Sequence, residues 1–437
     1  FEVVTGVQTC ALPILIIIIN ELKKEKEKAK MGKKILVLGT GAQGSTVAQR
    51  MDEEANVEKI ICADADHKAV DELVKILKKA EGAYVDADDV ESIKKAAEGV
   101  DLIVNALPIR FAPKVLDAAL AVKANYQDFA ATDVLDPWWP TCVEIMYNDY
   151  GKKFAEIGKL AIIGTGSAPG MMCVATKSSM RYLDTCDDIL MMVYEGVEAK
   201  RFLPFWWSPF TALSDMTDPT FALKDGVLVE TEPHSLPVTR HFKGCAKEVT
   251  LVEHAHDETV YMGLNKDTHF KGAKNINFKY GGVGIEFSTP LYRAGLLNRE
   301  EETYKGHTFI PFDVIVSHLP PAPKYHDEIK EILDEGLVKD EGAFVVEATG
   351  TKDGKKVMVE TYLYAPGCEE SFKRAGITGE QYLTGQCGSL FTKMFVNDDY
   401  DQTGLLSSDM LTYEECDKYL AYAAKLDITL ETEVKPL

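Results

Sequence analysis

The chain lacks several features that mark common classes of protein. Its nine cysteines include no Cys-x-x-Cys pair and no Cys/His cluster with metal-ligand spacing, so we expect neither a metal site nor a disulfide scaffold. The longest apolar run, residues 11–19, contains Pro13 and is far shorter than the ~20 residues that span a bilayer. Internal repeats and low-complexity linkers are absent as well. The sequence therefore predicts an ordinary globular fold.

Positive charge is also scarce. Lys and Arg total 48 against 69 Asp and Glu, which gives a formal net charge of −21 at pH 7. Nucleic acids and anionic membranes would repel such a surface. The length of 437 residues and the hydrophobic content of 46% fit two domains, each with its own core. We expect a cytoplasmic protein with a small-molecule substrate and no nucleic-acid or membrane partner.

A glycine motif is the most informative part of the chain. The apolar run 33–38 leads into Gly39-Thr40-Gly41-Ala42-Gln43-Gly44, and a helical pattern follows. In this arrangement Gly39 permits the turn, Gly41 lets the backbone approach a pyrophosphate, and Gly44 lets the helix pack closely. The alternative is a glycine turn that binds nothing. We predict that the dinucleotide contacts Gly39, Gly41, Ala42, Gln43 and Gly44.

Asp64 ends the next predicted strand, where a carboxylate can accept hydrogen bonds from a ribose 2′-hydroxyl. The same carboxylate would repel a 2′-phosphate, and only His67 and Lys68 supply positive charge nearby. The sequence therefore favours NAD as cofactor, with NADP possible.

Strand and helix patterns alternate from residue 31 to residue 167, which is typical of a doubly wound Rossmann sheet. Ligands bind at the carboxyl edge of such sheets, so polar residues at strand ends become candidates. Asp86 could bind the adenine amino group or cap the following helix. The strand end formed by Asn105, Ala106, Leu107 and Pro108 could run under the nicotinamide ribose or only terminate the strand.

The pattern changes after residue 167. Residues 168–385 mix strands, helices and long loops, and segments 345–348 and 356–363 read as a hairpin around a turn with Asp353-Gly354. We predict a second, α+β domain there, with a mixed or antiparallel sheet. Residues 386–437 are expected to form helices that pack back on the Rossmann domain. Residues 1–30 are expected to be a non-native or disordered leader.

Several motifs occur in the order seen in the saccharopine dehydrogenase family, and the chain resembles its lysine 6-dehydrogenase branch. They are the glycine motif, segments 86–89 and 104–107, Asp128, and segments 168–171, 207–209 and 217–219. The resemblance implies a Rossmann domain and an α+β catalytic domain that also mediates homodimerisation. It further implies nicotinamide-linked oxidation or reduction at a carbon–nitrogen bond of an amino-acid-like substrate.

Oxidation of an amine needs a group that accepts protons from the nitrogen and from water. Asp128, at a strand end beside the expected nicotinamide, is the first candidate for base or amine anchor. Its alternative role is to cap the turn that follows. His241, His254 and His256 are further candidates from the second domain.

An amino-acid substrate also needs a partner for its carboxylate, and arginine suits both oxygens. Arg110 is placed best for this role, ahead of Arg201, Arg240 and Arg293. Trp207 could form a wall of the substrate pocket, or it could belong to a helix start in which Ser208 is the cap.

Two other functions stay open at this point. A condensing dehydrogenase would join an amine to an aldehyde or keto acid by reduction. A non-catalytic sensor would keep the glycine motif and Asp64 while transferring no hydride.

Overall fold

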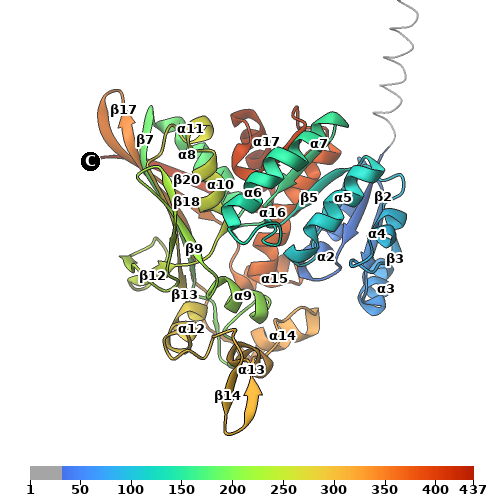
Figure 1. Ribbon diagram of the computed structural model, residues 1–437, viewed down its shortest axis with the longest axis horizontal. Coiled ribbons are helices and arrows are strands. Elements are labelled where there is room, and N and C mark those ends of the chain that lie inside the picture. Colours follow the sequence, from blue (N-terminus) through green and yellow to red (C-terminus); the bar gives the residue numbers. More distant parts are fainter. Residues whose placement is uncertain (1–31) are drawn as a thin grey trace, which may run out of the picture.

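Two β-sheets and the helices around them make up the computed structural model, which describes residues 32–437. The expected leader, residues 1–30, lies outside the described residues. Figure 1 shows the early part of the chain gathered around one sheet and most of residues 185–365 around the other. This confirms the predicted fold class, a Rossmann sheet with a second α+β unit.

The first sheet has seven parallel strands in the order β19-β6-β5-β4-β1-β2-β3. Its strands are β1 (Lys33–Leu38), β2 (Val57–Asp64), β3 (Ala80–Tyr84), β4 (Leu102–Asn105), β5 (Asn125–Asp128), β6 (Leu160–Ile163) and β19 (Gly404–Ser407). The strand order reverses between β1 and β4, and a ligand crevice forms at such a point. Ile35, Leu36 and Val37 are wholly buried, which explains why this strand is apolar without alternation.

Helices cover both faces of this sheet. They are α2 (Ala42–Asp52), α3 (His67–Ile76), α4 (Val90–Ala96), α5 (Ala112–Val122), α6 (Trp139–Ile145) and α7 (Gly151–Glu156). The next helix, α8 (Met171–Ser179), packs against the second sheet. Helix α3 ends at Ile76, and β3 begins four residues later at Ala80. A π-helical turn, Met146–Tyr150, lies between α6 and α7.

The second sheet has nine strands and is mixed, since β13 and β7 are parallel and its other pairs are antiparallel. Its strands are β7 (Thr185–Glu195), β9 (Thr220–Lys224), β10 (Val227–Thr231), β11 (Val238–Arg240), β12 (Val249–Glu253), β13 (Asn275–Gly282), β17 (Gly342–Lys352), β18 (Lys355–Tyr364) and β20 (Thr429–Pro436). The expected hairpin is β17–β18. Asp353 and Gly354 have φ values of 49° and 73°, the left-handed pair that favours Asp-Gly in a two-residue turn.

The remaining elements of the second unit surround this sheet. They are β8 (Glu198–Ala199) with β16 (Leu337–Lys339), β14 (Glu302–Tyr304) with β15 (His307–Phe309), and helices α9 (Pro209–Asp215), α10 (Asp257–Leu264), α11 (Lys266–His269), α12 (Val283–Arg293), α13 (Pro311–His318) and α14 (His326–Glu335). The β14 hairpin projects from the bottom of the molecule (Figure 1).

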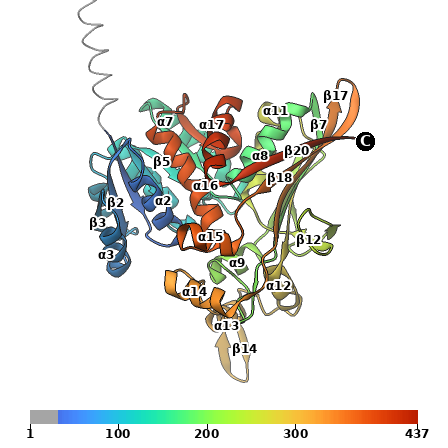
Figure 2. The same ribbon diagram turned by 180° about the vertical axis from the view of Figure 1, so that it is seen from behind.

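The C-terminal segment contacts both sheets. Its helices are α15 (Cys368–Ala375), α16 (Gly379–Val396) and α17 (Tyr413–Ala423). Figure 2 shows α16 beside α2. A Cβ atom on Gly385 would lie 2.7 Å from the Thr46 side chain, so glycine permits this close packing. Besides these helices, the segment contains two strands, β19 in the first sheet and β20 in the second.

Candidate functional site

The glycine motif forms the turn between β1 and α2, and each glycine has its own surroundings. Gly39 has φ +91°, and a Cβ there would lie 2.7 Å from the Ala106 carbonyl oxygen. A Cβ on Gly44 would lie 1.9 Å from the Gly39 oxygen, whereas a Cβ on Gly41 would meet nothing within 4 Å. Gly39 and Gly44 are therefore required by the fold itself, and Gly41 faces open space.

Helix α2 begins after Gly41 without a side-chain cap, which leaves its first N–H groups available to an anion. The neighbouring Asp64 carboxylate accepts hydrogen bonds from the Thr40 N–H at 2.7 Å and the Asp66 N–H at 3.0 Å. It is thus held beside the glycine turn at the end of β2. These residues fit a dinucleotide, and the individual contacts of Ala42, Gln43 and Asp64 remain predictions.

The next two strand ends are shaped by local hydrogen bonds. Asp86 is exposed and accepts a bond from the Asp88 N–H at 2.9 Å, while Asp89 caps α4. Asn105 is buried, donates to the Tyr126 hydroxyl at 3.0 Å and accepts from the Leu107 N–H at 3.2 Å. These two hydrogen bonds of Asn105 therefore fix the position of the strand end from Asn105 to Pro108.

Asp128 lies at the end of β5 and is only 2% exposed. Its carboxylate accepts hydrogen bonds from the Gly164 N–H at 3.0 Å and the Tyr126 hydroxyl at 2.8 Å. Burial raises the pKa of Asp128 well above its usual range, and these two hydrogen bonds lower it in part. Its proposed role as base remains a prediction, but in this structure the carboxyl faces protein groups.

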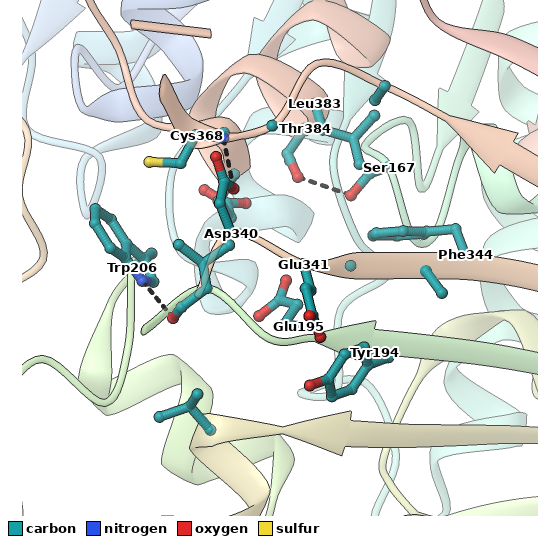
Figure 3. Close-up of a pocket in the computed structure, with 18 of the residues that line it drawn as sticks. Ser167, Tyr194, Glu195, Trp206, Asp340, Glu341, Phe344, Cys368, Leu383 and Thr384 are labelled. Carbon is teal, nitrogen blue, oxygen red and sulfur yellow. Dashed lines mark hydrogen bonds between the residues drawn. The ribbon is translucent and has the colours of Figure 1, made fainter. Parts of the chain in front are cut away.

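A cavity of about 330 Å³ lies between the second sheet and the start of α16 (Figure 3). Strands β7, β13, β17 and β18, the loops beside them and the first turns of α16 supply its walls. The Ser167 and Thr384 hydroxyl groups, which also line it, are joined by a 2.8 Å hydrogen bond. Much of the lining is aromatic, and these residues are Tyr194, Phe205, Trp206, Trp207, Tyr280, Phe344, Tyr362 and Tyr364.

One of the acidic residues that line the cavity, Glu380, connects it to the glycine motif. The Gln43 side-chain amide in α2 approaches the Glu380 carboxylate at 3.4 Å. Burial raises the pKa of Glu380 to about 7, and the charge of Glu195 adds to the rise. A carboxyl group that titrates near neutral pH is suited to proton transfer.

Glu195 lines the same cavity, at the end of β7. Burial raises its pKa, and contacts with Tyr280 and Trp207 together with the charge of His256 offset part of the rise. The His256 side chain is 13% exposed and pairs with Glu258 at 2.5 Å. Burial alone would lower the pKa of His256, but the surrounding carboxyl groups, Glu258 foremost, raise it to about 8.

The two substrate-binding candidates that the sequence predicts, Trp207 and Arg110, lie in different places in the structure. Trp207 lines the cavity, and Ser208 caps α9 by accepting from the Thr211 N–H at 3.3 Å. Arg110 is exposed, with its guanidinium 4.3 Å from the Phe111 ring centroid, and is not among the lining residues. Arg110 therefore does not supply the expected carboxylate partner within this cavity.

The other candidates have partners elsewhere or lie at the surface. Arg201 pairs with Glu331 at 2.9 Å and Arg240 with Glu347 at 3.0 Å. Arg293 and His241 are exposed, and the buried His254 hydrogen-bonds to the Ala255 carbonyl. No arginine lines the cavity formed by the described residues.

Glu195 and Glu380 were missed at the sequence level. Glu195 is the last residue of β7, and Glu380 lies in the first turn of α16. The capping box of Thr378 and Gln381 is the signal that could have located the true helix start.

Within residues 32–437, three or more His, Cys, Asp or Glu side chains nowhere gather in a way that could hold a metal ion. The same part of the chain contains no helix with the length and apolar character needed to cross a membrane.

Comparison with known proteins gives one family match and several relatives. Residues 35–162 match the family described as "Saccharopine dehydrogenase NADP binding domain". The chain is also 22% identical over 414 residues to carboxyaminopropylagmatine dehydrogenase from Synechocystis sp., which covers 90% of this chain and 96% of that protein.

Two solved structures share the fold. Apo saccharopine dehydrogenase (L-Glu forming) from Saccharomyces cerevisiae has a TM-score of 0.64 at 15% identity, over 92% of this chain and 100% of that chain. Homospermidine synthase from Legionella pneumophila, in complex with NAD, has a TM-score of 0.64 at 9% identity, over 92% and 91%. At these identities the likeness shows the fold alone. Residues 35–162 are thus similar to the NADP-binding domain of the saccharopine dehydrogenase family.

Proposed function

We propose that the protein is an NAD(P)-dependent oxidoreductase that acts on a carbon–nitrogen bond of an amine, including amino-acid-like amines. The observation that carries this proposal is the Gln43–Glu380 contact. It joins the helix of the dinucleotide motif to a cavity whose carboxyl group titrates near neutral pH. An enzyme of this class needs a cofactor motif, a substrate space and a proton acceptor next to one another.

The relatives support the reaction class. They are named for carboxyaminopropylagmatine, saccharopine and homospermidine, and all three compounds are amines. In the proposed reaction a hydride leaves the carbon, a proton leaves the nitrogen, and the resulting imine is hydrolysed by water. The lysine 6-dehydrogenase type of chemistry is one member of this class.

The residues that would hold the dinucleotide are those of the glycine turn with Asp64, Asp86 and the strand end from Asn105 to Pro108. The bound nicotinamide supplies the hydride acceptor or donor. We propose Asp64 as the residue that favours NAD over NADP, because its carboxylate would repel a 2′-phosphate. Ala42 and Gln43 lie at the open N-terminus of α2, where the pyrophosphate would bind.

Proton transfer is assigned to Glu380. Its carboxylate lines the cavity beside Gln43, so it can take a proton from the substrate nitrogen or from the attacking water. Asp128 would act as a positioning residue, because its carboxyl is buried and holds Tyr126 and, through it, Asn105.

The test is an absorbance assay at the reduced-nicotinamide band with NAD or NADP and a panel of amino acids and diamines. The reverse assay uses NADH, ammonia or an amine, and carbonyl compounds. We expect turnover in at least one direction. Turnover only with an amine plus a carbonyl would identify a condensing dehydrogenase, and cofactor binding without turnover on any compound would favour the sensor. Size-exclusion chromatography tests the homodimer that the family resemblance implies.

A further inference from the structure

The charge balance of the cavity is one-sided. Its lining contains four acidic residues and one basic residue, Lys243. The Lys243 ammonium pairs with Glu431 at 3.0 Å and lies 4.8 Å from the Tyr362 ring centroid. This lysine therefore already has a carboxylate partner on β20.

Two of the four acids have structural tasks. Asp340 accepts hydrogen bonds from the Cys368 N–H at 2.9 Å and the Glu369 N–H at 3.3 Å, which fixes the first turn of α15. Glu341 accepts from the Ala246 N–H at 3.3 Å. Both carboxylates thus stabilise neighbouring backbone.

Glu195 and Glu380 are different, because within residues 32–437 no lysine or arginine is among the groups that shift the pKa of either carboxyl group; the positive charge that acts on Glu195 is that of His256. Glu380 lies at the Gln43 end of the cavity. In the view of Figure 3, the Glu195 side chain lies in the middle of the group, with Trp206 on one side and Phe344 on the other. Glu195 thus lines the cavity from the end of β7, whereas Glu380 lines it from the first turn of α16.

The aromatic walls suit a cation. Trp206 donates its indole N–H to the Val197 carbonyl at 3.0 Å, which fixes the ring, and Trp207, Tyr194 and Tyr280 complete this part of the lining. The faces of such rings attract ammonium and guanidinium groups. A carboxylate at the same place would face Glu195 with no arginine to bind it.

We propose that Glu195 and the surrounding aromatic rings bind a positively charged end of the substrate, a primary ammonium or a guanidinium. The substrate is then an amine with a second cationic group, and the reacting carbon–nitrogen bond lies toward Glu380 and the glycine motif. This inference rests on the proposed function for the reacting end and on the cavity alone for the charged end.

The experiment measures binding of three amines of similar length to the full chain with NADH, by titration calorimetry. The probes are 1,5-diaminopentane, pentylamine, which lacks the second charge, and 6-aminohexanoate, which carries a carboxylate at that end. Agmatine is added to compare guanidinium with ammonium. Because a charge-assisted hydrogen bond is lost, we expect 1,5-diaminopentane to bind about 10-fold or more tightly than pentylamine, and 6-aminohexanoate to bind most weakly.

The variant Glu195→Gln keeps the shape of the side chain and removes its charge. It should abolish the preference for 1,5-diaminopentane over pentylamine while pentylamine binding stays within about 2-fold, since that amine lacks the affected group. Glu433→Gln is the matched control, because Glu433 is exposed on β20 and outside the cavity lining. Retained pentylamine binding also shows that Glu195→Gln is folded.

Two results would overturn the inference. One is 6-aminohexanoate binding as tightly as 1,5-diaminopentane, and the other is an unchanged preference in Glu195→Gln. Turnover separates the two proposals. Oxidation only of carboxylate-ended amines would support the oxidoreductase and contradict the cation site. Binding of diamines without any turnover would support the cation site and contradict the oxidoreductase.

Discussion

The Gln43 amide and the Glu380 carboxylate lie 3.4 Å apart across 337 residues of chain. Gln43 is the second residue of α2, and Glu380 is the second residue of α16. The contact therefore joins the first turns of two helices, one that would bind the cofactor and one that lines the substrate space. Cofactor binding and the protonation of Glu380 should influence each other.

Gly41→Ala tests the dinucleotide site without disturbing the fold. A Cβ at Gly41 meets nothing within 4 Å, and its φ is −70°, so we expect an unchanged melting temperature. The added methyl group would lie where a pyrophosphate approaches, and NADH binding, measured by fluorescence titration, should weaken by about 10-fold or more. Gly39→Ala is the contrast, since its φ of +91° makes the folded state itself strained. Full NADH affinity in Gly41→Ala would place the cofactor elsewhere.

Asp64→Ala tests cofactor choice. Loss of the carboxylate should weaken NAD binding by about 10-fold and NADP binding much less, because the repulsion of the 2′-phosphate is relieved at the same time. The measurement compares the dissociation constants of NAD and NADP for the natural chain and for Asp64→Ala. Since the two Asp64 oxygens also accept from the Thr40 and Asp66 N–H groups, the melting temperature of Asp64→Ala is the control for the local structure. Equal losses for both cofactors would remove this assignment.

Glu380→Gln tests the carboxyl group with the raised pKa. Its pKa is about 7 in the folded chain against an ordinary value of 4.5, so the folded state binds the proton more tightly than the unfolded state. Stability from this group is therefore present at low pH and is lost as pH rises from 4.5 to 7. We expect the free energy of unfolding of Glu380→Gln to exceed that of the natural chain by about 1–3 kcal/mol between pH 5 and pH 8. Urea unfolding measures this difference.

The same variant has a kinetic signature. If Glu380 accepts the proton during amine oxidation, kcat/KM should rise with pH through about 7 in the natural chain, because the deprotonated form is the active one. This rise should be absent in Glu380→Gln. A profile that keeps its rise near pH 7 in the variant would assign the proton transfer to another group.

Asp128→Asn tests the carboxylate that the sequence placed first as base. Because Asp128 is 2% exposed and its oxygens accept from Gly164 and Tyr126, we expect a loss of about 1–3 kcal/mol in unfolding free energy. Turnover should fall only in part, with its pH profile unchanged. Complete loss of turnover in a folded Asp128→Asn protein would instead support Asp128 as the base.

The first sheet was predictable because its signals are local. A buried parallel strand is apolar throughout, and a glycine turn with fixed spacing follows β1, so residues 33–64 indicate both fold and cofactor. The hairpin β17–β18 was equally clear from Asp353-Gly354. By contrast, β19 and β20 pair with strands far away in the chain, and short segments of this kind carry little pattern of their own.

The cavity was not predictable for the same reason. Its walls come from four strands of the second sheet, from α16 and from several loops, and no spacing in the sequence links Glu195 to Glu380. Trp207 was predicted to line a substrate pocket because bulky aromatic residues stand at a family motif. Arg110 was placed by proximity to a strand end, but the exposed position of its side chain depends on the loop that follows β4.

The late pairing of β19 with β6, together with the seating of α16 on α2, has a consequence for biosynthesis. A ribosome makes the Rossmann strands first, yet one edge of their sheet and one flank of α2 are completed only by residues 379–407. During synthesis of the roughly 200 residues in between, an unpaired strand edge and apolar helix faces are exposed, which favours association with chaperones. The cofactor site matures only when the last tenth or so of the chain is being added.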